Sequence, residues 1–395
     1  MKRVFAVVAV MCATARAAAD PLQLRADALA TTAAPAGLVT VSADGDAGHG
    51  VTAEAAVWTA GGTMNSTGTA GDGSHADILV MVLRAHTDDG RASGRIGRFV
   101  ESLGALRPVQ VDGAAGRVGL PLRIDVEAFA GIPVVPGLMT TRAWDWIVGG
   151  RVSRRIGELG SVGLAYAEQR TDGELATEEL GIDAGASLGK RDDVGAKLAY
   201  DLANPGLAEV SLTASHRFQA LRAELYSSYR AASHLLPATS LFSVLGDVPA
   251  ERAGTTLTWR AAPRLDVTGD LGVRHADGDT APEVVLRAKL RLDALGASAL
   301  SAELRRDGVG DQQWTGARGS ARIALPHALL ISTELELVVP DHDRGLGAVW
   351  PWALVALGWD NGTWHTALAG EADASPQDRR RVDVLVQVGR QWGAR

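Results

Sequence analysis

The chain has 395 residues and a formal net charge of -7 at pH 7, with 46% hydrophobic and 22% charged residues. This apolar fraction excludes a disordered chain, and the acidic balance argues against a nucleic-acid-binding protein, which would carry a basic face. The length exceeds that of a usual single-core domain, so we expect either several domains or one extended sheet. The one cysteine, Cys12, gives no basis for a disulfide framework, a zinc-thiolate site or thiol catalysis.

Residues 1–19 have the pattern of a secretory signal peptide. Lys2 and Arg3 form a basic start, an apolar run extends from Val4 to Ala13, and small residues follow at 17–19. We therefore expect export of the chain, with residues 20–395 as the mature protein. No later apolar stretch is long enough to predict a transmembrane helix.

From about residue 120 onward, apolar and polar residues alternate with a period of two. In the segment 265–274, for example, Leu271 and Val273 alternate with Asp270 and Arg274. Successive side chains of a strand point to opposite faces, whereas an amphipathic helix would need apolar spacings of three and four. The pattern predicts an all-β protein. The segments in the middle of the chain are expected at 143–154, 158–170, 178–188, 193–203, 206–216 and 218–230.

Most of these segments have about 10 to 13 residues, whereas a tilted strand needs about 9 to 11 residues to cross a bilayer. The connections between them alternate between short and long. Short turns are expected at Ala261–Pro263, Leu295–Gly296, Pro326–His327 and Asn361–Gly362, and longer loops at 131–142, 231–250, 276–281, 307–313, 340–347 and 373–377. Short turns at one end and longer loops at the other are typical of bacterial outer-membrane barrels.

The same alternation gives a strand count. About seven strands precede residue 131, six lie between the loops at 131–142 and 231–250, and nine follow. The prediction is therefore a single antiparallel transmembrane β-barrel of about 22 strands, within a range of roughly 16–22. The assignment is least clear before residue 75.

Four short stretches carry a more specific likeness. They are Gly94-Arg95-Ile96-Gly97-Arg98-Phe99 with Val111-Asp112-Gly113, then Glu127-Ala128-Phe129-Ala130-Gly131-Ile132-Pro133, and Leu236-Pro237-Ala238-Thr239-Ser240-Leu241-Phe242-Ser243. On these stretches the chain resembles proteobacterial outer-membrane β-barrels of the porin-like kind. The resemblance implies a barrel in the cell outer membrane. The chain departs from this class in two respects. Such barrels usually end on an aromatic residue, whereas here Gly393, Ala394 and Arg395 follow Trp392, and the aromatic content is only 5%. A sparse aromatic girdle is expected from Trp146, Trp259, Trp314, Trp352, Trp359 and Trp364.

Motifs that carry catalytic or metal chemistry are weak. Ser187 fits a Gly-x-Ser-x-Gly pattern, but it lies in an alternating strand just before a turn, whereas the nucleophile elbow needs a strand, a turn and a helix. The stretches 44–46 and 277–279 read Asp-Gly-Asp, which we interpret as turns because neither continues into a calcium loop. Asp341-His342-Asp343 is interpreted as a solvated loop. We predict no catalytic residue, no metal site and no cofactor.

The polar faces of the strands are the candidate functional surface. Arg287, Lys289 and Arg291 form a basic row, whereas Glu334 and Glu336 form an acidic one. In a barrel such rows face the lumen and set the field that an ion meets, although they can also pair with one another and only solvate the wall. The predicted pore-lining residues are Asp266, Asp270, Arg274, Arg287, Lys289, Arg291, Glu334 and Glu336.

The leading hypothesis is therefore a passive, porin-like channel for small solutes or ions, surrounded by outer-membrane lipid. The main alternative is a barrel that serves as sheath or scaffold for a periplasmic or surface partner such as an electron-transfer cytochrome. The chain has no Cys-x-x-Cys-His haem site of its own. An outer-membrane lipid hydrolase and a secreted β-sandwich are the remaining alternatives; the first lacks a visible Ser/His pair, and the second conflicts with the strand length.

Overall fold

The computed structural model describes residues 23–31, 36–48, 50–62, 73–134, 145–231, 249–276, 278–342, 348–374 and 381–392. Several expectations lie outside these residues. They are the signal peptide at 1–19, the loop motif at 236–243, and single members of two acidic motifs, Asp277 and Asp343.

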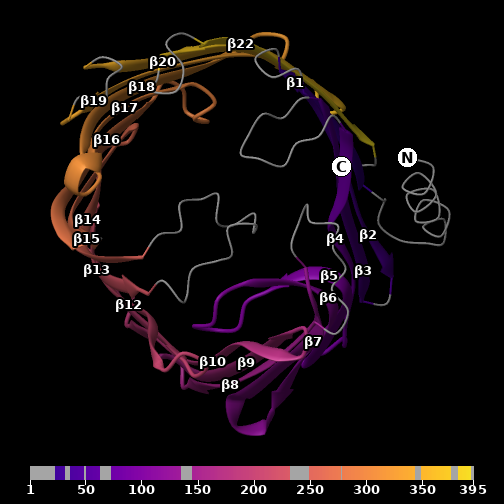
Figure 1. The fold of residues 1–395 in the computed structure, drawn as a ribbon. Coiled ribbons are helices and arrows are strands. Elements are labelled where there is room, and N and C mark those ends of the chain that lie inside the picture. The colour runs from indigo at the N-terminus through magenta and orange to yellow at the C-terminus, as the bar shows by residue number, and fades with distance from the viewer. Residues whose placement is uncertain are drawn as a thin grey trace.

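The described chain forms 22 antiparallel strands that close into one barrel (Figure 1). β1 pairs with β2 on one side and with β22 on the other, so the sheet has no free first or last strand. Closure matters because an open sheet edge exposes a row of unpaired N–H and C=O groups. No helix among the described residues has the length and apolar character needed to span a bilayer.

The strands have the following bounds: β1 Gln23–Thr31, β2 Ala36–Gly48, β3 Val51–Gly62, β4 Gly73–His86, β5 Ala92–Glu101, β6 Val109–Leu120, β7 Ile124–Pro133, β8 Trp146–Ile156, β9 Gly160–Thr171, β10 Glu174–Leu188, β11 Asp192–Asp201, β12 Gly206–Arg217, β13 Leu221–Arg230, β14 Ala250–Ala262, β15 Leu265–Ala276, β16 Asp279–Arg291, β17 Ala299–Asp307, β18 Trp314–Leu325, β19 Leu329–Pro340, β20 Trp350–Asp360, β21 Trp364–Asp373 and β22 Arg381–Trp392. Two short 3-10 turns, η1 at Pro121–Arg123 and η4 at Gly310–Gln312, lie between strands.

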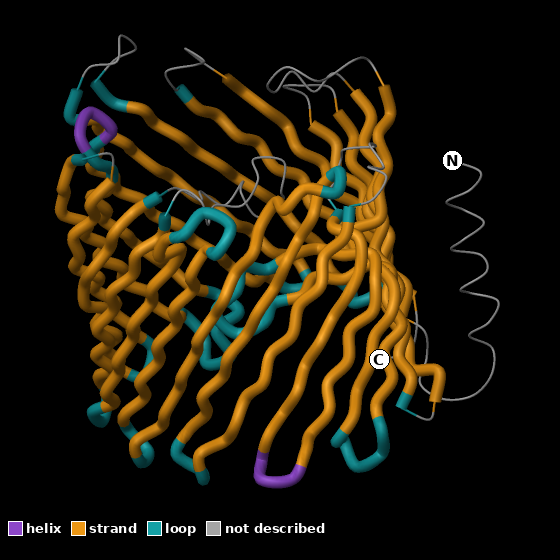
Figure 2. Tube along the Cα trace, turned by 60° about the horizontal axis from the view of Figure 1, so that its bottom comes forward, coloured by secondary structure: helices purple, strands orange, loops and turns teal. Residues whose placement is uncertain are grey.

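These bounds confirm the predicted architecture. β1 to β7 precede the connection near residue 135, β8 to β13 follow it, and β14 to β22 follow the connection at 231–249. In Figure 2 the strands run obliquely between the two ends of the barrel, with the short turns and η1 at the bottom and η4 at the top. The period of two and the alternating loop lengths therefore located the strands correctly.

Three connections differ from the prediction. The connection expected between the segments 158–170 and 178–188 is a two-residue turn, because β9 ends at Thr171 and β10 begins at Glu174. The loop expected at 276–281 is a tight turn, because β16 already begins at Asp279 and Gly278 takes a positive φ of 87°. The turn expected at Leu295–Gly296 is the longer connection 292–298. Asp293 organises that connection by accepting the backbone N–H groups of Ala297 at 3.0 Å and Ser298 at 2.5 Å. The bond from Ser298 is the main reason why the pKa of Asp293 is lowered.

The outer face of the wall is apolar. Leu271, Leu335 and Leu368 are 54%, 64% and 54% exposed, and they stand at alternate positions along their strands. Trp146, Trp259 and Trp364 of the expected aromatic girdle are also exposed. Trp352 is not part of it, because its indole N–H donates to Glu371 at 2.7 Å. An apolar surface around a wall whose strands are paired is what a lipid bilayer requires.

We expect Leu335→Arg to lower the free energy of unfolding in lipid vesicles by about 2–4 kcal/mol, because the charge would enter the hydrocarbon. Urea titration followed by tryptophan fluorescence measures this change. Ser320→Arg is the matched control, since it places the same charge on the other face of the sheet, directly opposite Glu334. Equal stability of the two variants would contradict an outward, lipid-facing position for Leu335.

Candidate functional site

The inner face of the barrel carries the polar side chains. On β15, Asp266, Asp270 and Arg274 alternate with the exposed Leu271 and Val273. On β16, Arg287, Lys289 and Arg291 alternate with the exposed Leu286 and Leu290, and on β19 Glu334 and Glu336 flank the exposed Leu335. All eight predicted pore-lining residues thus share the face opposite the apolar coat.

The structure brings acids and bases together instead of leaving rows of one sign. Arg291 meets Asp266 at 3.0 Å, and the Arg287 Nε donates to Glu303 at 2.6 Å. The basic row of β16 therefore lies between acids of the neighbouring strands β15 and β17. Of the two expectations, the arrangement therefore favours charges that pair along the wall over a row of unpaired positive charges.

Three of the other predicted residues, Glu334, Arg274 and Asp270, also have polar partners in the wall. Glu334 binds Arg318 at 2.5 Å, and Arg274 lies 3.7 Å from Glu283 and 3.8 Å from Asp307. Asp270 accepts hydrogen bonds from Tyr226 at 2.8 Å and Thr256 at 2.5 Å. These bonds hold each side chain against the wall and reduce its freedom to reach across the lumen.

Two carboxylates missed in the sequence organise this region. The side chain of Glu283 is only 6% exposed and receives Arg252 at 2.6 Å, and that of Glu303 is 8% exposed between Arg287 and Arg305. Both occupy polar positions of the same alternation, so the sequence contained the signal. Rows of one sign on a single strand do not reveal these two residues, because their ion pairs form between strands.

The most distinctive inner feature is the end of the β5–β6 hairpin, which projects into the barrel (Figure 1). We call residues 98–112 the hairpin tip. Its side chains Phe99, Leu103, Leu106 and Val111 are almost fully buried. They pack in one apolar cluster against Val82 of β4, Phe129 of β7, Ile147 of β8 and Ala165 of β9.

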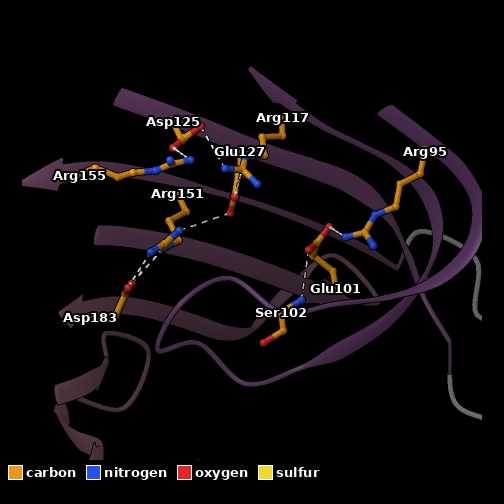
Figure 3. Close-up of polar contacts among 9 residues, drawn as sticks. All are labelled: Arg95, Glu101, Ser102, Arg117, Asp125, Glu127, Arg151, Arg155 and Asp183. Carbon is orange, nitrogen blue, oxygen red and sulfur yellow. Dashed lines mark hydrogen bonds and ion pairs between the residues drawn. The ribbon is translucent and has the colours of Figure 1, made fainter. Parts of the chain in front are cut away.

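Ion pairs fix the hairpin tip to the wall. Arg107 contacts Glu179 of β10 at 2.9 Å, and the Glu179 side chain is only 4% exposed. At the base of the tip, Arg95 contacts Glu101 at 2.5 Å, while Glu101 accepts the backbone N–H of Ser102 at 3.2 Å (Figure 3). Because these groups lose water, their pairing decides whether the position of the tip is stable.

Below the tip, charges alternate from strand to strand along the wall. Asp125 and Glu127 of β7 form ion pairs with Arg117 of β6. Arg151 of β8 forms ion pairs with Glu127 at 3.6 Å and with Asp183 of β10 at 2.6 Å (Figure 3). Next to them is a cavity of about 390 Å³. It is lined by Arg84, His86, Arg95, Glu101, Arg117 and Glu127, among others. The cavity offers both guanidinium donors and carboxylate acceptors to a small polar solute.

The inward course of the tip is not among the features predicted from the sequence. The available signal was the composition of the connection 102–108, which contains Leu103, Ala105 and Leu106 between Gly104 and Pro108. An exposed loop of an outer-membrane barrel has little reason to carry closely spaced leucines. Ser187, by contrast, lies in β10 as expected and donates to Asp193 at 2.7 Å.

No known protein-family profile matches the chain, and no curated protein is detectably similar in sequence. Several solved structures share its fold. The translocation pore of the P pilus usher PapC matches with a TM-score of 0.55 at 10% identity, covering 95% of this chain and 100% of the usher chain. PapC in an E. coli P pilus tip assembly intermediate gives a TM-score of 0.54 at 10% identity, covering 94% and 61%.

The ferric enterobactin receptor PfeA of Pseudomonas aeruginosa, in complex with enterobactin, matches with a TM-score of 0.60 at 8% identity. The match covers 95% of this chain and 82% of the receptor. These likenesses concern the barrel fold. They agree with a closed antiparallel β-barrel as the fold of this chain.

We expect Asp183→Asn to lower the free energy of unfolding by about 2 kcal/mol, because it removes a charge-assisted pair whose two side chains are mostly buried. Chemical unfolding in detergent micelles measures the change. Glu224→Gln is the control, since its partner Arg222 is 49% exposed and such pairs contribute about 0–1 kcal/mol. Equal losses in the two variants would contradict a structural role for the Arg151–Asp183 pair.

Proposed function

We propose that the protein is a passive channel of the outer membrane that admits small polar solutes and ions. The observation that carries this proposal is the closed wall with one apolar and one charged face. Lipid accepts the first, whereas the second needs water or polar partners. A large closed barrel with a polar lining therefore supports an aqueous path along its axis.

The path would be selective by size and by charge. The hairpin tip reduces the cross-section on the side of β7 to β10, where Arg107 and Leu106 approach the wall. Beside it, Arg84, Arg95 and Arg117 alternate with Glu101 and Glu127 around the cavity. Such a lining favours zwitterionic or hydrogen-bonding solutes over apolar ones, because each charged group of the solute meets a partner of opposite sign.

Single-channel recording in a planar lipid bilayer tests the proposal. We expect purified protein to give discrete conductance steps. In a salt gradient, we expect Lys289→Glu to shift the reversal potential in the direction of greater cation selectivity, because a positive charge in the lumen is replaced by a negative one. Lys190→Glu makes the same charge change in the turn between β10 and β11 and should leave the selectivity nearly unchanged. A correctly folded barrel without conductance would contradict the channel. Co-purification of that silent barrel with a haem protein would favour the sheath.

A further inference from the structure

The hairpin tip begins at a row of three glycines that lie side by side on neighbouring strands. Gly97 of β5 pairs with Gly113 of β6, and Gly113 pairs with Gly131 of β7. Gly97 has a φ of 124°, which side-chain-bearing residues rarely adopt, and a Cβ on Gly113 would stand 2.6 Å from the Cα of Gly131. With no side chains along this line, the three strands can bend together.

At the same level β5 separates from β4. The antiparallel register runs from His86 with Ser93 to Met81 with Arg98 and stops there. It would continue as Val80 with Phe99 and Leu79 with Val100. All four residues are described and none of these pairs forms, whereas β5 stays paired with β6 up to Glu101. On its other side β6 stays paired with β7 as far as Val111 with Pro133, and the Val134 N–H donates to the Gln110 carbonyl at 2.8 Å. The tip has therefore left β4 while it keeps its connection to β7.

Side chains of the tip replace the lost backbone partners. Arg98 donates to the carbonyl of Ile78 at 2.9 Å and to the Asp77 carboxylate at 2.9 Å, and Gln110 donates to the carbonyl of Leu79 at 2.6 Å. Asp112 holds the other side of the Arg98 guanidinium at 2.7 Å. The same β4 carbonyls would accept backbone N–H groups if β5 returned to the wall, so one set of hydrogen bonds can be exchanged for another.

The far end of the tip rests on β10. A Cβ on Gly181 would lie 3.0 Å from the Leu106 side chain and 3.3 Å from the Cβ of Ala105, and Arg107 pairs with Glu179 two residues away. Docking buries Leu103 and Leu106, which favours the inward position. The inward position is thus the resting one, and a return to the wall would expose these leucines to the lumen.

We propose that the hairpin tip is a gate that swings about the glycine row Gly97–Gly113–Gly131 between an inward, docked position and a position in the barrel wall. In the docked position the tip narrows the lumen. In the wall position the tip completes the β4–β5 ladder, and the lumen becomes wider. The proposal rests on the proposed channel function and names its regulation. The exchange of side-chain for backbone hydrogen bonds keeps the two positions close enough in free energy for both to be populated.

A reversible disulfide between the tip and the wall tests the gate. In Ala105→Cys/Gly181→Cys the two Cβ atoms would be 3.3 Å apart, close to the range of about 3.5–4.5 Å found in disulfides. The variant is made in a Cys12→Ser background and recorded in planar bilayers, first oxidised and then reduced. The two single-cysteine variants are controls, and heat-modifiable gel mobility verifies that each barrel is folded.

We expect the oxidised channel to stay at its lower conductance level, and reduction to restore openings to a higher level that the single-cysteine controls also show. Identical records in both redox states of a fully cross-linked variant would overturn the gate while leaving the channel intact. Absence of conductance in every variant, the wild type included, would overturn the channel itself.

A second variant keeps the test decisive if the cysteine pair does not fold. Arg107→Gln removes the ion pair that docks the tip, and we expect it to increase the time spent at the higher level on the order of tenfold. Arg222→Gln removes a luminal arginine of β13, which lies away from the tip, and should leave that time unchanged. An unchanged dwell time in Arg107→Gln would contradict the docked position as the restraint.

Discussion

The need to pair the edge of every strand governs this molecule. Closure through β1 and β22 removes the outermost edges, so the backbone is satisfied around the ring and only side chains decide what each face does. The early stop of the ladder between β4 and β5 shows how strong this constraint is. There Arg98 and Gln110 supply the donors that the β4 carbonyls of Ile78 and Leu79 would otherwise lack.

The inner face follows from a second requirement, the pairing of charges that have lost part of their water. Glu179, Glu283 and Glu303 are nearly buried in the wall, and each has an arginine beside it. Pairing between neighbouring strands makes the wall a mosaic of both signs, so the field inside varies over short distances. A solute that carries both charges meets complementary groups along such a wall, and this property links the packing of the strands to the proposed selectivity.

The hairpin tip combines both requirements. It leaves the wall where a row of glycines lets three strands bend, and it exchanges backbone partners for Arg98 and Gln110. It is then held by buried leucines and by Arg107 on β10. The strands also allow the tip to return to the wall. The β4–β5 register stops at Met81 and Arg98, but both strands have further residues that could continue the pairing.

The sequence by itself determined the sheet. Its period of two and the spacing of its turns specified the strand number, the order along the chain and the face to which Asp270 or Leu271 points, because these properties are local to each strand. The tertiary structure alone decided the partners of Glu283 and Glu303 and the inward course of residues 98–112. Charge pairs join residues on different strands, and the tip is placed by contacts with β10, far along the chain. Such contacts depend on the closed curvature of the wall, which no single segment of the sequence contains.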